Sequence, residues 1–286
     1  MVTIFALAAA ALYGTADFLG GAAARRASVI SVLAVVAPSG AVIMLVAAPL
    51  AGGPVSAAGL GWGIAGGAVG GAGLIMFYAG FASAPMSVVA PVSALVSTLL
   101  PVGVAVADGE RPSPAVLAGA LICLVAIALV SMETGGRGDA AGRDVPVRPG
   151  RALCYAVAAG AAFGLFYLFI RNAGTSGVLW PVSVARLSGT LVALLAAAWT
   201  QTRPVGWRGD RGTFCMAMAS GVIDAIANVC YVLATRAGLF GLAVVITALY
   251  PGMTVLLARL LLGERMRSAQ RAGLALAALG IVLVTL

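Results

Sequence analysis

The sequence contains no lysine and no histidine, and only 9% of its residues are charged. Its 17 basic residues are therefore all arginine. A Walker A loop needs a lysine against the phosphates, and Schiff-base catalysis needs a lysine amine. Ser-His-Asp triads and paired-histidine zinc motifs need histidine. These ATPase and enzyme sites are excluded, and we expect a protein that is not an enzyme.

Cysteine is nearly as scarce as charge. The cysteines lie in apolar runs without close metal-ligand spacing, which predicts small membrane-buried side chains rather than disulfides or metal ligands. We therefore expect no metal site and no cofactor. The four residues are Cys123, Cys154, Cys215 and Cys230.

Apolar residues make up 62% of the chain, and the mean hydropathy is +1.10, which predicts an integral membrane protein. The net charge of +8 is then expected to set topology and to meet anionic lipid headgroups, with no nucleic acid as partner. The oligomeric state stays open. With about 20 apolar residues needed per span, we predict ten transmembrane helices, at residues 2–22, 29–49, 58–81, 86–107, 114–132, 152–171, 178–200, 212–235, 239–262 and 268–286.

The tripeptide Gly109-Glu110-Arg111 returns as Gly263-Glu264-Arg265, each time between two apolar runs. Aligning 109–132 with 263–286 without a gap gives nine identities in 24 positions, which indicates a tandem duplication. A half with five spans begins and ends on opposite sides, so its copy enters the membrane upside down. The predicted fold is all-α: two inverted five-helix repeats, 1–132 and 151–286, around a central cavity, joined by a polar linker at 133–150.

Arginine is unevenly divided among the predicted loops. Loops after odd-numbered spans hold twelve arginines and loops after even-numbered spans hold three. The positive-inside rule then places the odd-numbered loops in the cytoplasm and both termini outside.

Two features concern helix packing. Gly59, Gly63, Gly67 and Gly71 form a ladder without side chains in the third span, which favours close packing within one subunit over a dimer face. Prolines are predicted inside four spans, where neighbours or water must meet the freed carbonyls. They are Pro91, Pro101, Pro181 and Pro251.

Asp224 lies about midway between Arg211 and Arg236, roughly 20 Å from each along a helix, and hence near the bilayer centre. A carboxylate there must be paired, protonated or hydrated. A polar stripe on the same helix suits a water-filled cavity, or alternatively a structural hydrogen-bond network. The stripe consists of Ser220, Asp224, Asn228 and Tyr231.

Two further charges lie within predicted spans. Asp17 follows Tyr13 by one turn and is either a second cavity acid or a residue near the membrane surface. Arg186 lies roughly 9 Å inside the interface, since it follows Trp180 by six residues. A buried arginine needs an anion, so Arg186 pairs with one of the two acids or receives a substrate carboxylate, and we favour an intramolecular ion pair.

The chain resembles the ten-span EamA branch of the drug/metabolite transporter superfamily. The resemblance rests on the inverted halves, the openings Tyr13-Gly14 and Phe163-Gly164, the run from Met86 to Leu95, and Gly-Glu after spans four and nine. It implies ten helices around a cavity and export of small metabolites, amino acids or drugs, often by proton exchange. It also implies cytoplasmic termini, whereas the arginine count places the termini outside. Four-span relatives carry an essential acid in the first helix, and Asp17 lies in the comparable helix here.

We therefore predict a secondary active exporter in the multi-pass setting of a bacterial plasma membrane, with a small solute, membrane lipids and protons as partners. Asp224 is the favoured proton-coupling group. The alternatives are an uncoupled facilitator, an intramembrane lipid-modifying enzyme, and a membrane scaffold without transport. The predicted cavity lining is Tyr13, Asp17, Ser93, Tyr167, Arg186, Asp224, Asn228, Tyr231 and Thr247.

Overall fold

The computed structural model describes residues 1–83, 86–109, 114–131, 149–174, 179–206, 210–262 and 268–285. Within these ranges the chain is helical and contains no strand. The helices are α1 (Val2–Ala24), α2 (Val29–Ala51), α3 (Ala57–Ser83), α4 (Met86–Ala107), α5 (Pro114–Ser131), α6 (Pro149–Asn172), α7 (Trp180–Trp199), α8 (Arg211–Arg236), α9 (Phe240–Thr247), α10 (Tyr250–Leu262) and α11 (Ser268–Thr285).

Six helices of the described part are long and apolar enough to cross a membrane, namely α1, α2, α3, α6, α7 and α8. Shorter apolar helices accompany them, among them Phe240–Thr254. Large apolar side chains point outward from the bundle; Leu50 is 83% exposed and Leu195 is 60% exposed. Such a surface suits lipid tails, as the composition predicted. The count of ten spans stays a prediction.

The predicted ninth span, 239–262, is not one helix. It consists of α9 and α10, and the break falls at residues 248–249. Pro251 is the second residue of α10, and Pro181 is the second residue of α7 rather than an interior one. Proline lacks an N–H and is tolerated in a first turn, so these two residues begin helices instead of kinking them.

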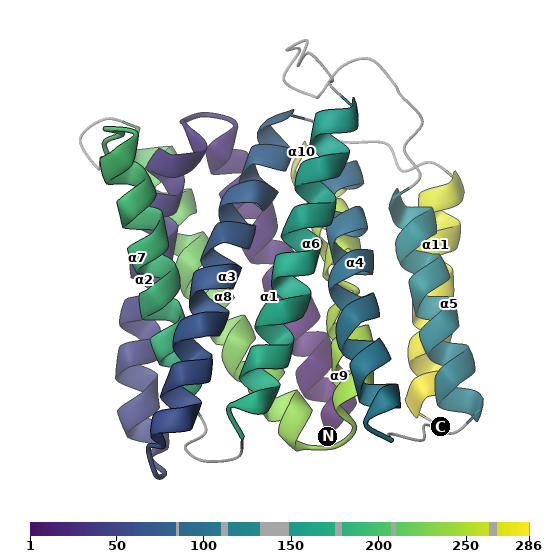
Figure 1. The fold of residues 1–286 in the computed structure, drawn as a ribbon. Helices are drawn as coiled ribbons and strands as arrows, with labels where there is room; N and C mark the ends of the chain where they lie inside the picture. The colour runs from purple at the N-terminus through teal and green to yellow at the C-terminus, as the bar shows by residue number, and fades with distance from the viewer. Residues whose placement is uncertain are drawn as a thin grey trace.

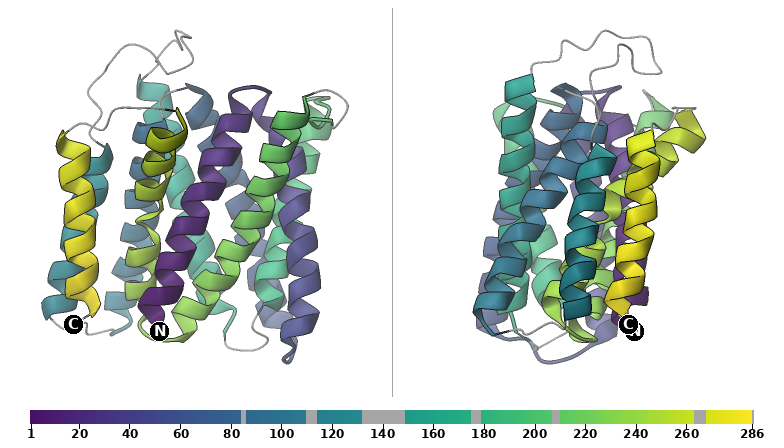
Figure 2. Two further views of the ribbon diagram at one scale, coloured as in Figure 1. Left: turned by 180° about the vertical axis from the view of Figure 1, so that it is seen from behind. Right: turned by 90° about the vertical axis from the view of Figure 1, so that its right-hand side faces the viewer.

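The helices run alongside one another, and both chain termini lie at the same end of the molecule (Figure 1). We call this end the lower face; the start of α1 and the end of α8 meet there, since Gly238 lies against Val2. The opposite end is the upper face. Helices α5 and α11 pack against each other and form a pair at one side of the bundle (Figure 2).

The most extensive packing joins the first half of the chain to the second. Helix α1 packs on α8 and α3 packs on α6; α3 also packs on α7, and α2 packs on α8. Likewise α4 packs on α6, and α1 packs on α9 and α10. The two halves therefore share one core, and neither has a hydrophobic core of its own.

Glycines allow the closest of these contacts. A Cβ at Gly67 of α3 would collide with the backbone carbonyl of Ala185 in α7, and one at Gly63 would collide with the carbonyl of Pro181. The third-span ladder thus packs within one subunit, which confirms the favoured reading. A side chain at these positions would force α3 and α7 apart.

The contact between α2 and α8 has the same form. A Cβ at Gly221 of α8 would collide with the carbonyl of Val36 in α2, as at Gly67 and Ala185. A Cβ at Gly40 would lie 2.8 Å from the carbonyl oxygen of Gly221, and one at Gly189 would lie 3.2 Å from that of Gly67. Two glycine pairs therefore allow close backbone packing in the same way: 67 with 189 between α3 and α7, and 221 with 40 between α8 and α2.

Helix α8 begins at a capping aspartate. The Asp210 carboxylate accepts hydrogen bonds from the Thr213 hydroxyl and, at 3.1 Å, from the Thr213 backbone N–H. These bonds lower the pKa of Asp210 below its usual value. The ionised form accepts both bonds, so the cap is fully present above the ordinary carboxyl pKa and is lost as the pH falls through the lowered one.

Gly67→Ala and Gly221→Ala should each lower the thermal stability of the detergent-solubilised protein, by roughly 1–3 kcal/mol, because the added methyl group overpacks a backbone contact. Gly61→Ala is the matched control, since a Cβ at Gly61 meets no atom within 4 Å. Its melting temperature should stay level or rise slightly. Equal melting temperatures for Gly67→Ala and Gly61→Ala would contradict the close approach of α3 and α7.

Candidate functional site

A cavity of about 120 Å³ lies in the middle of the bundle. This volume can hold several water molecules or part of a small organic solute. Helices from both halves line it. Its polar lining consists of Tyr13, Asp17, Ser97, Tyr167, Arg186, Thr190, Asp224, Asn228 and Tyr250.

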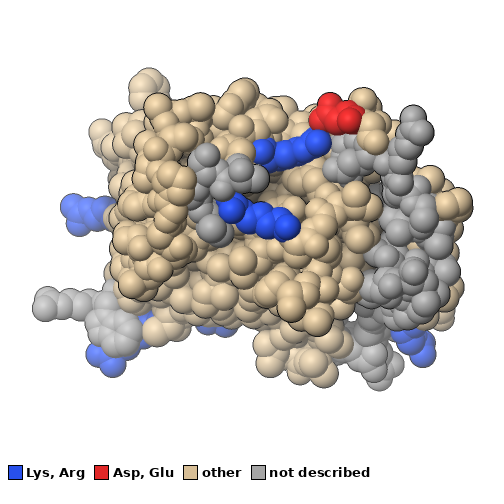
Figure 3. All heavy atoms as spheres, turned by 90° about the horizontal axis from the view of Figure 1, so that it is seen from below, with Lys and Arg blue, Asp and Glu red and all other residues tan. Residues whose placement is uncertain are grey.

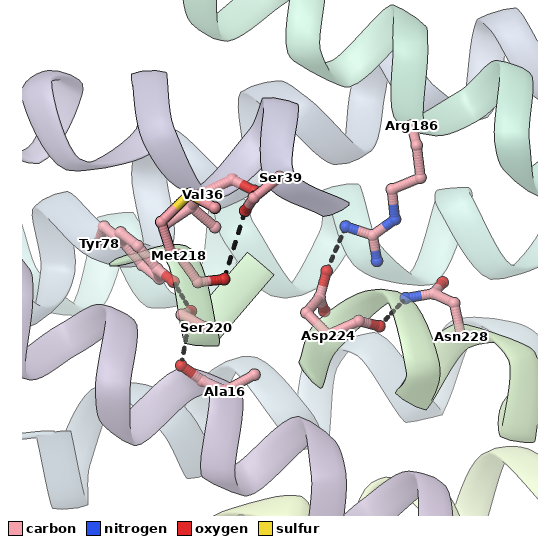
Figure 4. Close-up of polar contacts among 9 residues, drawn as sticks. All are labelled: Ala16, Val36, Ser39, Tyr78, Arg186, Met218, Ser220, Asp224 and Asn228. Carbon is pink, nitrogen blue, oxygen red and sulfur yellow. Dashed lines mark hydrogen bonds and ion pairs between the residues drawn. The ribbon is translucent and has the colours of Figure 1, made fainter. Parts of the chain in front are cut away.

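The strongest charge interaction at this cavity is the ion pair between Arg186 of α7 and Asp224 of α8. Figure 4 shows the guanidinium reaching across to the carboxylate from the opposite helix. The two side chains are 18% and 20% exposed, so both are largely withdrawn from solvent while still facing the cavity. The pair confirms the prediction that Arg186 holds an acid of its own chain.

The rest of the polar stripe on α8 is divided between the cavity and the packing of helices. The Asn228 side-chain N–H donates to the Asp224 backbone carbonyl at 2.8 Å, and the residue lines the cavity (Figure 4). The Ser220 hydroxyl donates to the Ala16 carbonyl at 2.8 Å and accepts from the Tyr78 hydroxyl at 3.3 Å. Ser220 therefore joins α8 to α1 and α3, which is the structural role left open by the sequence.

Asp17 lines the cavity as well, which decides between its two predicted positions. Its α1 neighbour Tyr13 lines the same space and is 9% exposed. Within the described ranges, no ion pair or hydrogen bond joins the Asp17 carboxylate to another residue. The cavity thus combines a neutralised acid, Asp224, with a second acid, Asp17, that has no ion-pair partner among the described residues.

Aromatic rings form much of the remaining wall. Phe163, Phe166 and Tyr167 line it from α6, and Tyr250 lines it from the start of α10. The Tyr250 hydroxyl donates to the Ala90 carbonyl at 3.3 Å. Beside them the wall is bare backbone at Gly67, Gly70, Gly71 and Gly189, and a Cβ at Gly70 would lie 3.2 Å from the Phe166 ring.

Three residues of the predicted lining do not reach the cavity wall. Ser93 and Thr247 are buried at 0% and 1% exposure on α4 and α9, and their hydroxyls make no hydrogen bond of normal geometry within the described part. Tyr231 is 1% exposed and lies behind Tyr167, with ring centroids 4.7 Å apart. These three form an outer layer around the site.

Sequence reasoning missed Ser97, Phe166, Thr190 and Tyr250 as lining residues. Hydroxyl and aromatic side chains are common in apolar helices, so the spacing of Ser97 and Phe166 gave no signal, whereas Thr190 lies one turn past Arg186 on the same helix face. Tyr250 had a signal, since it precedes Pro251 and the chain breaks there. Pro251 was predicted to lie inside a span rather than at the start of a helix.

At the lower face, Arg171 at the end of α6 joins two other elements. Its guanidinium lies 2.8 Å from the Asp108 carboxylate beyond α4 and 4.9 Å from the centre of the Phe240 ring at the start of α9. Figure 3 looks onto this face, where basic side chains border a hollow and an acidic group lies beside one of them. These contacts lie about one helical turn below Tyr167.

The described residues contain no group of three potential ligands that could hold a metal ion. Cys154 and Cys215 are free and exposed on apolar helices, and Cys230 is free and half-buried. Several predictions lie outside the described residues: the Glu-Arg part of the first tripeptide, the whole second tripeptide, most of the linker and the side chain of Cys123.

Comparison with known proteins identifies the second half of the chain. Residues 150–286 match the model of the EamA-like transporter family, and this segment is an EamA-like transporter domain. No curated protein matches the chain. Fourteen chains of solved structures match it. One, described as the crystal structure of a protein, covers 99% of this chain and 96% of its own, with a TM-score of 0.76 and 20% sequence identity.

That likeness shows the fold alone, and it extends over the first half, where the family model does not match. The apolar helices and the matched family together support a multi-pass membrane protein. The resemblance of residues 1–132 to the same family stays a prediction.

Removing one partner of the central ion pair should destabilise the protein more than removing both. Arg186→Met and Asp224→Leu should each lower stability by about 2 kcal/mol, because each leaves a charge unpaired in the bundle. The double variant should lose less than the sum, measured as a double-mutant cycle of thermal unfolding in detergent.

The more exposed pair of Arg171 and Asp108 supplies the matched control, and the coupling energy in its own double-mutant cycle should stay below about 1 kcal/mol. Strictly additive losses at Arg186 and Asp224 would contradict a direct interaction.

Proposed function

We propose that this protein is a secondary active transporter that moves small organic solutes across the membrane by alternating access. The observation that carries the proposal is a polar cavity, with the Arg186–Asp224 ion pair at its centre, enclosed by apolar helices. Charged side chains inside a membrane protein generally mark a solute or ion pathway. A structural scaffold has no need of such a cavity, and the EamA-like domain is a transporter domain.

The proposed architecture is a pair of inverted five-span repeats, with α9 and α10 together acting as one discontinuous span. In this architecture α1, α2 and α3 correspond to α6, α7 and α8. Contacts between helices support it, because the packed pair α1–α8 has its counterpart in α6–α3, and α3–α7 has its counterpart in α8–α2. Single residues follow the same exchange. Gly67 and Gly221 differ by the 154-residue shift that relates the two Gly-Glu-Arg tripeptides, and both lie on a carbonyl of the facing helix.

The cavity suits a small solute with both polar and apolar parts. Aromatic rings of α6 and α10 provide apolar surface, while the carboxylates and the guanidinium provide charged contacts. A metabolite, an amino acid or a drug of similar size fits this chemistry. The glycine wall lets a solute approach the backbone of α3 and α7 directly.

Proton coupling needs a carboxyl group that can bind and release a proton during the cycle. Asp224 was the favoured group from the sequence, but its carboxylate is already paired with the Arg186 guanidinium. Asp17 lines the same cavity without a charged partner in the described part of the chain. We therefore propose Asp17 as the coupling group and the Arg186–Asp224 pair as a solute contact.

Export is the proposed direction, and a bacterial plasma membrane is the proposed location; both follow from the family resemblance. The orientation rests on the arginine count, which places the termini outside. The lower face, with the N-terminus, would then be the outer one.

An uncoupled facilitator is the second candidate. The ion pair favours it, because a neutralised acid can line a pore without taking part in proton transfer. In that case solute flux follows the solute gradient alone.

The test is flux from proteoliposomes loaded with pooled metabolites and amino acids, followed by mass spectrometry with and without an imposed pH gradient. The wild-type protein should accelerate the loss of at least one solute, and the pH gradient should increase that rate. Asp17→Asn should keep flux down the solute gradient and lose the response to pH. Asp224→Asn should slow flux and keep the response.

Each competing interpretation has its own outcome. Loss of the pH response only in Asp224→Asn would return the coupling role to Asp224. Wild-type flux that ignores a collapsed proton gradient identifies a facilitator. No flux above protein-free liposomes for any pooled solute would contradict transport of these solute classes.

A further inference from the structure

Two layers of side chains bracket the cavity, one toward each face, and they differ in how their polar groups are satisfied. In the upper layer, Tyr78 lies one turn above Leu74 of the cavity wall, and Ser220 lies one turn above Asp224. The Tyr78 hydroxyl bonds to Ser220, which bonds to the Ala16 carbonyl (Figure 4). Every hydroxyl of this layer therefore has a partner, and the layer ties three helices together.

In the lower layer, the rings of Tyr167 and Tyr231 lie against each other between the cavity and the lower face. Tyr167 lines the cavity, whereas Tyr231 is 1% exposed and its hydroxyl has no hydrogen-bond partner within the described part. Tyr231 is three residues past Asn228 of the cavity wall and five residues before the end of α8. The layer is thus about one turn thick and lies between the cavity and the lower face.

Below the ring pair, Arg171 holds the ends of three elements together. It contacts Asp108 beyond α4 and Phe240 at the start of α9, and it follows Tyr167 on α6 by one turn. The Asp108 side chain is 55% exposed, so this contact is at the surface and breaks easily. Arg171 therefore joins the lower end of α6 to the ends of α4 and α9, directly below the ring pair.

We propose that Tyr167 and Tyr231 form the gate between the cavity and the lower face, and that Arg171 is its latch. The inference rests on the proposed transport function, because a gate has a purpose only if solute passes. Opening the gate wets the buried Tyr231 hydroxyl and gives it a hydrogen bond, which no described residue provides in the closed state. The closed state is therefore opposed by an unsatisfied hydroxyl and favoured by the Arg171 contacts.

The two contributions are of similar size, as a gate requires. A buried hydroxyl without a partner shifts an equilibrium by a factor of roughly 5 to 150. A surface ion pair and a cation–π contact together shift it the other way by a factor of roughly 3 to 30. Neither dominates, so the lower layer can open and close as solute or water occupies the cavity. The upper layer has no comparable unsatisfied hydroxyl among its described residues.

The experiment measures access to the cavity from the lower face. Ala193, a small buried residue of the cavity wall, is replaced by cysteine in a background without the four native cysteines. The rate of labelling by a membrane-impermeant charged thiol reagent, added to one side of proteoliposomes and then to the other, reports how often the gate opens.

Arg171→Ala should raise the labelling rate from the lower side by a factor of roughly 3 to 30, because the latch is lost. Tyr231→Phe should lower it by a factor of about 5 or more, because the closed state loses its unsatisfied hydroxyl. Tyr231→Phe should also raise the melting temperature, which most substitutions of buried residues do not.

The chain offers matched controls at the other end of α6. Arg151 contacts the Tyr155 hydroxyl at 3.2 Å and lies over its ring, far from the lower layer. Arg151→Ala and Tyr155→Phe should leave the lower-side labelling rate unchanged. Tyr167→Phe removes a hydroxyl that already faces the cavity, so it should not raise the melting temperature.

The gate is wrong if Arg171→Ala and Arg151→Ala label at the same rate, or if Tyr231→Phe labels faster than the parent. Labelling depends on access alone, so this outcome is separable from that of the transport assay. Solute flux with unchanged labelling would overturn the gate and leave transport standing. Changed labelling without any solute flux would support the gate and contradict transport.

Discussion

A charged side chain inside a bilayer must have a partner, and this requirement explains the arrangement of the bundle. Arg186 and Asp224 come from the middle of two different helices, and each neutralises the other. Such a pair survives only where apolar helices exclude bulk water and a cavity still allows local hydration. Both conditions hold here, because the pair faces a cavity surrounded by helices of both halves. The pair therefore fixes where α7 and α8 lie relative to the cavity.

Close approach of backbones makes this arrangement possible. Gly67 against Ala185 brings α3 to α7, and Gly221 against Val36 brings α8 to α2. Lipid tails are as apolar as leucine, so burial of apolar side chains contributes little in a membrane, and contact area between helices matters more. The glycines provide that area. They also leave part of the cavity wall without side chains, so the residues that hold the bundle together help to shape the site.

The sequence predicted the centre of the site better than its walls. Asp224 and Arg186 stand out because charges are rare in this chain, and an intramolecular ion pair was the favoured arrangement for Arg186. Asp17 was ambiguous, because its distance from the membrane surface depends on where α1 ends, and the helix continues to Ala24. Tyr250 and Phe166 were missed because an aromatic residue in an apolar helix gives no signal of which way it faces. Tyr231 was expected at the wall but lies behind Tyr167. It is seven residues past Asp224 and therefore lies about 10 Å further along α8.

Composition alone determined that this chain is helical and belongs in a membrane, because so many apolar side chains cannot be hidden in water and backbone groups in lipid must bond within their own helix. The scarcity of charge likewise singled out the acids and the arginine that matter. Tertiary structure decided that Arg186 pairs with Asp224, and that Asp17 lines the cavity without an ion-pair partner among the described residues. It also decided that one apolar run breaks into α9 and α10. Those outcomes depend on contacts between helices distant in the chain, and local residue patterns carry no information about them.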